Sequence, residues 1–181
     1  RVNHLPTSES YRSMPVNHYG LSKSVQTLYA KYYFNNFHVN VNIARTFNII
    51  GKGISRNLSV GSFVNQIKNA RDGENIYVGN INTKRDFLDI EDVIDAYWKI
   101  LLHGKSGEIY NVCSGRSYYI KDILGLLIKE SGKNLKIVIK DNLIKEHDIN
   151  DSYGSNSKLI ADTGWKPKVD IAISVEDCLR I

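Results

Sequence analysis

The stretch EIYNVCSGRSYYIKDILGLLIKESGKNLKIVI, residues 108–139, reads as a strand, a helix and a second strand. Residues 108–113 and 135–139 are rich in β-branched and aromatic side chains, which is typical of strands. Between them, residues 120–131 carry apolar side chains at helical spacing, and Gly132 is a common terminating residue for such a helix. This order of elements indicates an α/β protein.

The rest of the chain continues the alternation of helices and strands. Residues 1–16 are polar and contain two prolines, so we expect a loop there, and a second loop rich in Gly, Asn and Ser is expected after residue 46. Asn17 is a candidate cap for the first helix. The other predicted helices are residues 17–36, 62–71, 91–103 and 156–163, and the other extended segments are residues 39–46, 76–78 and 85–90.

The composition is that of an ordinary globular domain. With 181 residues, of which 42% are hydrophobic and 24% charged, the chain can bury a core. No apolar run approaches the roughly 18 residues of a membrane-spanning helix, so we expect no membrane partner. Two widely separated cysteines argue against a disulfide scaffold and favour a cytoplasmic location. The five histidines lack metal-ligand spacing, so no metal is expected.

The net charge of +5 leaves two interpretations open. A basic surface could bind nucleic acid, or a smaller basic pocket could bind an anionic metabolite. Basic and acidic residues are interspersed without a run of like charges, so solvated lysines are the simplest explanation and no nucleic-acid partner is expected. The chain starts without Met and stops inside a predicted helix at residues 174–181, so we expect it to be part of a longer protein.

Tyr19 and Lys23 are the sharpest chemical signal in the sequence. They are four residues apart in a predicted helix and therefore share one face. A nearby ammonium group favours the phenolate form of a tyrosine, so such a pair can pass a proton to or from a hydroxyl or carbonyl group. The alternative is an ordinary helix with one aromatic residue and one solvated lysine.

Several segments resemble motifs of the extended short-chain dehydrogenase/reductase family, which contains nucleotide-sugar epimerases, dehydratases and ketoreductases. PVNHYGLSK, residues 15–23, resembles the helix that carries the catalytic Tyr and Lys of that family. The forms YNVCSG and NSKL look most like those of reductases of GDP-4-keto-6-deoxymannose. The other matching segments follow in the family's order and are RTFN (45–48), RDFLDIEDV (85–93), YNVCSG (110–115), NSKL (156–159) and TGWKP (163–167).

The resemblance implies the C-terminal part of a Rossmann-type, doubly wound sheet with a small C-terminal α/β lobe that binds the substrate. Residues 1–58 would end the Rossmann domain, with the catalytic helix and the following strand. Residues 59–181 would form mainly the nucleotide-sugar lobe, with returns to the sheet. The Gly-rich loop that binds the cofactor pyrophosphate is not in the sequence, so we expect the chain alone to be inactive.

The resemblance also implies roles for single residues. Tyr19 would be the general acid/base at the sugar C4 oxygen, and Lys23 would assist it and bind the ribose of NAD or NADP. Thr46 and Asn48 would contact the cofactor, and Asn48 would also contact the nucleotide-diphosphate sugar. The expected activity is reduction of a 4-keto-6-deoxyhexose, with a GDP-linked sugar favoured. A 4-epimerase, a 4,6-dehydratase and a non-catalytic nucleotide-binding module remain alternatives.

The diphosphate would be held by Arg85, because a guanidinium fork suits phosphate oxygens. An ion pair of Arg85 with Asp86 or Asp89 is the alternative. Lys145 stands where the family often has a second arginine, which keeps the charge but loses the fork. Thr46 replaces the family's usual proline.

The family's catalytic helix packs against a partner subunit, so the resemblance also implies a homodimer. Residues 29–37 of this helix are rich in aromatic side chains, which we expect to be buried on two sides of the helix.

Overall fold

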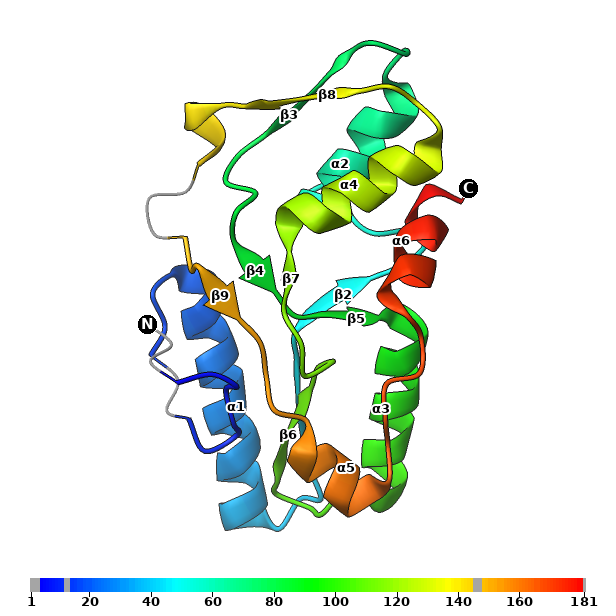
Figure 1. The fold of residues 1–181 in the computed structure, drawn as a ribbon. Coiled ribbons are helices and arrows are strands. Elements are labelled where there is room, and N and C mark those ends of the chain that lie inside the picture. The colour runs from blue at the N-terminus through cyan, green and yellow to red at the C-terminus, as the bar shows by residue number, and fades with distance from the viewer. Residues whose placement is uncertain (1–3, 12–13, 145–147, 181) are drawn as a thin grey trace.

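The computed structural model describes residues 4–11, 14–144 and 148–180. It has the predicted α/β architecture, with three two-stranded parallel sheets and one three-stranded mixed sheet (Figure 1). The division of the chain at residue 58 stays a prediction.

The first half of the fold surrounds a pair of parallel strands. β1 (Ile43–Thr46) pairs with β6 (Ile109–Val112), so Thr46 lies opposite Val112. Figure 1 shows α1 (His18–Phe37), in blue, on one side of this pair and α3 (Ile90–His103), in green, on the other. The short helix α5 (Ser157–Thr163) packs on α3 and β6.

The other spatial half of the fold starts with β2, which follows β1 directly in the chain. The strand β2 pairs with β5, β3 pairs with β8, and β4 lies between β7 and β9. Helices α2, α4 and α6 pack against one another beside these strands (Figure 1). The elements are β2 (Asn48–Ile50), α2 (Ser59–Asn69), β3 (Asn75–Val78), β4 (Lys84–Arg85), β5 (Phe87–Asp89), β7 (Tyr118–Tyr119), α4 (Ile120–Ser131), β8 (Lys136–Ile139), the 3₁₀ turn η1 (Asp141–Leu143), β9 (Asp151–Ser152) and α6 (Ile171–Leu179).

Each half is built around a hydrophobic cluster. One contains Ile67, Leu124 and Val175 and joins α2, α4 and α6. The other joins α3, β6 and α5 around Trp165, which is 1% exposed. The indole N–H of Trp165 donates to the main-chain oxygen of Asp92 at 3.1 Å, so this large side chain is buried without losing its polar partner.

Most predicted elements are confirmed. The two exceptions are strands whose bounds depend on pairing with a strand that is remote in the sequence. The strand expected over residues 39–46 begins only at Ile43, because its pairing begins there, with a bond from the Ile43 N–H to the Glu108 carbonyl. The strand β2 falls in a stretch that we expected to be a loop. Its partner β5 is remote in sequence, so no local pattern predicts this pairing.

The predicted first helix is confirmed, including its cap. The Asn17 side chain accepts a hydrogen bond from the Gly20 N–H at 2.8 Å, and the helix ends at His38 in the left-handed conformation. The expectation that its aromatic side chains are buried is wrong, since no described side chain of α1 is buried. Among the aromatic residues of α1, only Phe34 is partly covered, where its ring lies against Gly107.

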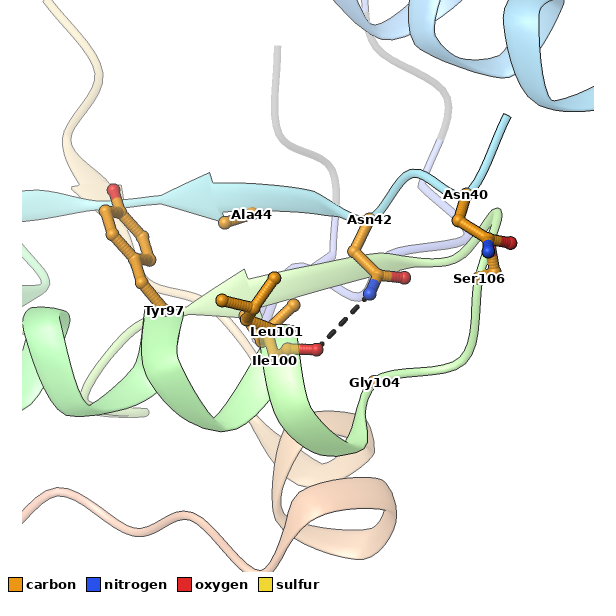
Figure 2. Close-up of a pocket in the computed structure, with 8 residues that line it drawn as sticks. All are labelled: Asn40, Asn42, Ala44, Tyr97, Ile100, Leu101, Gly104 and Ser106. Carbon is orange, nitrogen blue, oxygen red and sulfur yellow. Dashed lines mark hydrogen bonds between the residues drawn. The ribbon is translucent and has the colours of Figure 1, made fainter.

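An open cavity of about 490 Å³ lies between β1 and α3. Figure 2 shows Tyr97 on α3 at one end and Asn40 and Ser106 at the other, and between these ends the Asn42 amide donates to the Ile100 carbonyl at 3.2 Å. In the described part of the chain, β1 pairs only with β6, so its other edge is unpaired. The lining residues are Asn40, Asn42, Ala44, Tyr97, Ile100, Leu101, Gly104 and Ser106.

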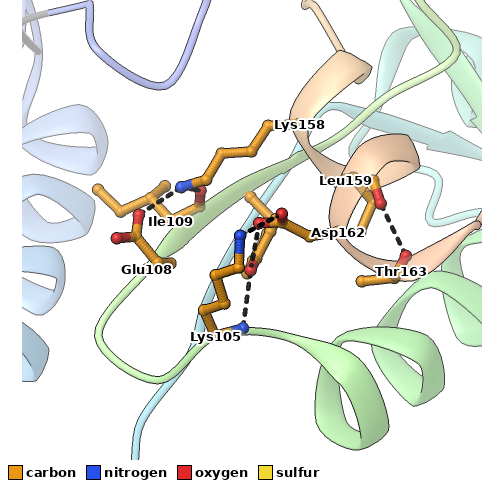
Figure 3. A network of polar contacts seen from close by, with 8 residues as sticks. Lys105, Glu108, Ile109, Lys158, Leu159, Asp162 and Thr163 are labelled. Carbon is orange, nitrogen blue, oxygen red and sulfur yellow. Dashed lines mark hydrogen bonds and ion pairs between the residues drawn. The ribbon is translucent and has the colours of Figure 1, made fainter.

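Two ion pairs attach α5 to the start of β6 (Figure 3). Asp162 accepts from the Lys105 ammonium at 2.6 Å and from the Tyr110 hydroxyl at 3.0 Å. Lys158 donates to the Glu108 carboxylate and, at 2.9 Å, to the Ile109 carbonyl. Hydrogen bonds from Lys105 and Lys158 hold the pKa values of Asp162 and Glu108 below their usual range.

Acid is expected to weaken this attachment. A carboxylate whose pKa is depressed by folding adds stability above its unfolded pKa and loses that contribution as pH falls through the folded pKa. We expect the Tm to fall between about pH 5 and about pH 3, and to fall less in Asp162→Asn. Scanning calorimetry of both proteins measures this. The matched control is Asp122→Asn in the first turn of α4, which should keep the wild-type acid sensitivity. If acid lowered the Tm of the wild type and of Asp162→Asn equally, the acid sensitivity would not come from the Asp162 carboxylate.

Candidate active site

Tyr19 and Lys23 lie in the first two turns of α1, where the Asn17 cap begins the helix. The side chain of Tyr19 is 72% exposed, and the Lys23 ammonium lies 5.6 Å from the centre of its ring. Lys23 also donates to the Gln26 side-chain oxygen at 3.2 Å. The four-residue spacing therefore brings a phenol and a cation onto one open face, as predicted. These two donors suit the hydroxyl and carbonyl oxygens of a sugar or a nicotinamide riboside.

Thr46 and Asn48 lie at the junction of β1 and β2. The Thr46 hydroxyl shares a 2.7 Å hydrogen bond with the hydroxyl of Tyr97 on α3. The Asn48 amide donates to the Asp86 carbonyl at 2.8 Å, and the residue is exposed. The carboxyl end of a strand is where ligands bind in doubly wound sheets. Thr46 is the last residue of β1, and Asn48 begins β2 just beyond it, so both residues stand in a suitable place.

The guanidinium of Arg85 is surrounded by oxygen atoms that accept its hydrogen bonds. It donates to the Asp148 carboxylate at 2.6 Å, the Ile149 carbonyl at 2.6 Å and the Lys84 carbonyl at 2.7 Å. The side chain as a whole is 21% exposed. The alternative of an ion pair was right in kind, but the partner is Asp148.

Both acidic neighbours named in that alternative are engaged elsewhere. The Asp86 carboxylate is buried and accepts from Ser114, Gly115 and Gly154. The Asp89 carboxylate caps α3 by accepting from the Glu91 N–H at 2.8 Å. Neither side chain is therefore available to Arg85.

The structure gathers only some of the predicted residues. Asn48 bonds to the carbonyl of Asp86, which is the residue that follows Arg85 in the chain. Within the described residues, no hydrogen bond or ion pair links Tyr19 or Lys23 to Thr46, Asn48 or Arg85. Lys145 lies outside the described residues.

The sequence prediction missed Asp148 as a partner of Arg85. The signal was present, because the family's second arginine precedes an aspartate by three residues and KEHD at residues 145–148 follows that pattern. The cavity between β1 and α3 was also not foreseen, and none of the predicted site residues lines it.

Among the described residues, no group of three or more His, Cys, Asp or Glu side chains could hold a metal ion. No helix in the described ranges combines the length and apolar character that crossing a bilayer requires.

The fold is that of Rossmann-type, NAD-dependent epimerases and dehydratases. Residues 1–178 match the sequence profile of the GDP-mannose 4,6-dehydratase family. The chain belongs to this family.

Curated relatives include two enzymes of GDP-linked deoxy sugars. The chain is 33% identical over 178 residues to GDP-6-deoxy-D-mannose reductase of Pseudomonas aeruginosa, covering 97% of this chain and 59% of the relative. It is 28% identical over 155 residues to GDP-6-deoxy-D-talose 4-dehydrogenase of Aggregatibacter actinomycetemcomitans, covering 84% of this chain and 51% of the relative. The chain thus spans between half and three fifths of the length of these proteins.

Solved structures agree with the sequence matches. The chain superimposes on RMD from Pseudomonas aeruginosa complexed with NADPH with a TM-score of 0.90 at 33% identity, covering 97% of this chain and 59% of that one. The UDP-glucose 4-epimerase of Thermotoga maritima gives a TM-score of 0.89 at 21% identity, covering 99% of this chain and 57% of that one. At that identity the second likeness shows the fold alone.

Proposed function

We propose that the protein containing this chain is an NAD(P)-dependent oxidoreductase that reduces the C4 carbonyl of a 4-keto-6-deoxyhexose linked to a nucleoside diphosphate, with GDP favoured. The observation that carries this proposal is the exposed Tyr19–Lys23 pair on one face of α1. The likeness to a GDP-6-deoxy-D-mannose reductase, and to a structure with NADPH, supports the direction and the cofactor class.

The chain's own residues would handle the proton. When bound, NAD(P)H supplies the hydride to the carbonyl carbon. As negative charge develops on the C4 oxygen, the Tyr19 hydroxyl donates its proton to that oxygen. The Lys23 ammonium stabilises the resulting phenolate by its charge, and it can donate a hydrogen bond to a ribose hydroxyl.

Substrate binding would fall to residues at the carboxyl ends of the strands. Asn48, fixed by its bond to the Asp86 carbonyl, would contact the sugar and the nicotinamide side, with Thr46 beside it. Arg85, whose side chain is 21% exposed, would hold the diphosphate through its guanidinium. Lys145 would add a second positive charge. In this proposal residues 1–58 belong to the cofactor half and residues 59–181 mainly to the sugar-nucleotide half.

The direct test is an assay of the native gene product. Oxidation of NADPH or NADH is followed at a fixed enzyme concentration with GDP-4-keto-6-deoxymannose and, in parallel, with the dTDP-linked keto sugar. The proposal predicts turnover with the GDP-linked substrate. Interconversion of UDP-sugars without net oxidation of the cofactor would favour the epimerase alternative. Dehydration of GDP-mannose would favour the dehydratase. Tight nucleotide binding without any turnover would favour a binding module.

The proposal includes a homodimer formed through α1. The rings of Tyr32, Tyr33 and Phe37 lie 5.4–5.9 Å apart in a cluster, and each is about half exposed. Exposed aromatic clusters of this kind are typical of protein interfaces. Sedimentation of the native gene product should give a dimer that Tyr32→Glu dissociates, and a monomeric wild type would contradict this.

We place the protein in the cytoplasm, which suits two buried free thiols, Cys113 and Cys178.

A further inference from the structure

Asp86 is a completely buried carboxylate outside the Tyr–Lys pair. Its Oδ1 accepts from the N–H and the hydroxyl of Ser114 at 2.8 and 2.7 Å. Its Oδ2 accepts from the N–H groups of Gly115 and Gly154, both at 3.2 Å. Burial raises the pKa of this carboxyl, and the donated hydrogen bonds oppose the rise. Burying a charged carboxylate costs free energy unless its oxygen atoms are hydrogen-bonded. Here four donors converge on the two oxygen atoms of Asp86.

The main chain of Asp86 is equally occupied. Its carbonyl accepts from both the N–H and the side-chain amide of Asn48, at 3.2 and 2.8 Å. Its N–H donates to the Ser152 carbonyl of β9 at 2.9 Å. The residue therefore joins three segments that are remote in sequence, which are the start of β2, the turn after β6 and the strand β9.

Gly154 shows how closely these segments approach. A Cβ atom at this position would lie 2.6 Å from the ring of Phe47 and 2.7 Å from the sulfur of Cys113. Only a glycine lets the main chain come near enough to donate to Asp86. Since Phe47 lies between Thr46 and Asn48, this contact also fixes the junction of β1 and β2.

We propose that Asp86 is a positioning residue that sets Asn48 and Arg85 at a fixed separation. It binds Asn48 directly through its carbonyl. It reaches Arg85 indirectly, because docking of β9 on β4 brings Asp148 and Ile149 to the guanidinium. The proposal rests on the proposed function, in which these two residues bind the sugar and the diphosphate of one ligand.

The test compares three variants of the native gene product. Asp86→Asn keeps the volume and removes one accepting oxygen. Ser114→Ala is the milder variant, since it removes only the hydroxyl donor. Asp92→Asn is the matched control, because this carboxylate is 3% exposed and accepts from the N–H groups of Lys168 and Val169, away from Asn48 and Arg85.

Binding of GDP is measured by calorimetry. We expect the Kd to rise about tenfold or more in Asp86→Asn, less in Ser114→Ala, and not at all in Asp92→Asn, although the Tm should fall in both Asp variants. A residue with a merely structural role would move Tm without separating the two Asp variants in Kd. If all variants bind GDP as wild type does, the positioning role is wrong.

Hydrogen exchange gives a readout that does not depend on the ligand. Amide exchange in residues 46–50 and 150–155 should be faster in Asp86→Asn than in Asp92→Asn. Equal exchange in these segments overturns the positioning role even if wild type binds no nucleotide. Conversely, a wild type that fails to bind GDP overturns the proposed function, and the exchange comparison still decides the role of Asp86.

Discussion

Replacing Tyr19 by phenylalanine in the native gene product is expected to lower kcat about 10²–10⁴-fold while leaving the Kd for the nucleotide sugar nearly unchanged. The substitution removes one hydroxyl and little volume from a side chain that is 72% exposed, so the fold has no reason to change. The proton donor for the C4 oxygen is lost, whereas the groups proposed to bind the diphosphate remain. Steady-state kinetics with NADPH and the keto sugar, together with calorimetric binding, separate the two effects.

The matched control is Tyr77→Phe, which removes a phenolic hydroxyl from β3, outside the proposed site. It should keep the wild-type kcat. Lys23→Met should lower kcat as well, because the cation beside the Tyr19 ring is lost. Near-native turnover of Tyr19→Phe would assign the proton transfer to another group.

Replacing Arg85 by alanine is expected to raise the Kd for GDP about ten- to hundredfold. Hydrogen bonds to charged groups contribute about 1.5–3 kcal/mol, and each 1.4 kcal/mol corresponds to a factor of about ten. Arg85→Lys should recover only part of the affinity, because an ammonium group keeps the charge without the planar fork. Calorimetry with GDP and with guanosine measures the loss, and the nucleoside should show little change.

Arg85 also contacts Asp148 and Ile149, so a structural loss has to be separated from a binding loss. The control for charge is Arg180→Ala at the end of α6, which removes a cation paired with Glu176. It should leave the Kd for GDP unchanged. Unaltered affinity in Arg85→Ala, with a lowered Tm, would limit this residue to holding β9 in place.

Local patterns predicted the parts of the fold that depend on neighbouring residues. The helix α1 and its Asn17 cap follow from side chains within a few positions of each other, and so does the shared face of Tyr19 and Lys23. The strand β2 escaped prediction because its hydrogen bonds come from β5, which is remote in the sequence. Exposure of the α1 aromatics also escaped, since periodicity tells which residues share a face but not what covers that face.

The candidate site also divides into residues that a local motif predicted and contacts between segments remote in sequence that it could not predict. The sequence identified Arg85 and Asn48 by motif, but most of the oxygen atoms that hold them come from other segments. The ion pair from Arg85 to Asp148 joins residues 63 positions apart. The bond from Gly154 to Asp86 joins residues 68 positions apart. Such contacts depend on how segments pack, and no spacing rule within a single motif could have shown that one buried carboxylate connects them.

The close approach at Gly154 has an evolutionary consequence. Loop positions usually tolerate exchange, and their sequences drift while the scaffold is kept. Residue 154 stands in a loop but is enclosed by Phe47, Cys113 and Asp86, so even one added methyl group would have to displace an aromatic ring or a sulfur atom. Selection should therefore treat this loop residue as it treats a core residue, and substitutions there would require compensating changes at positions 47 and 113.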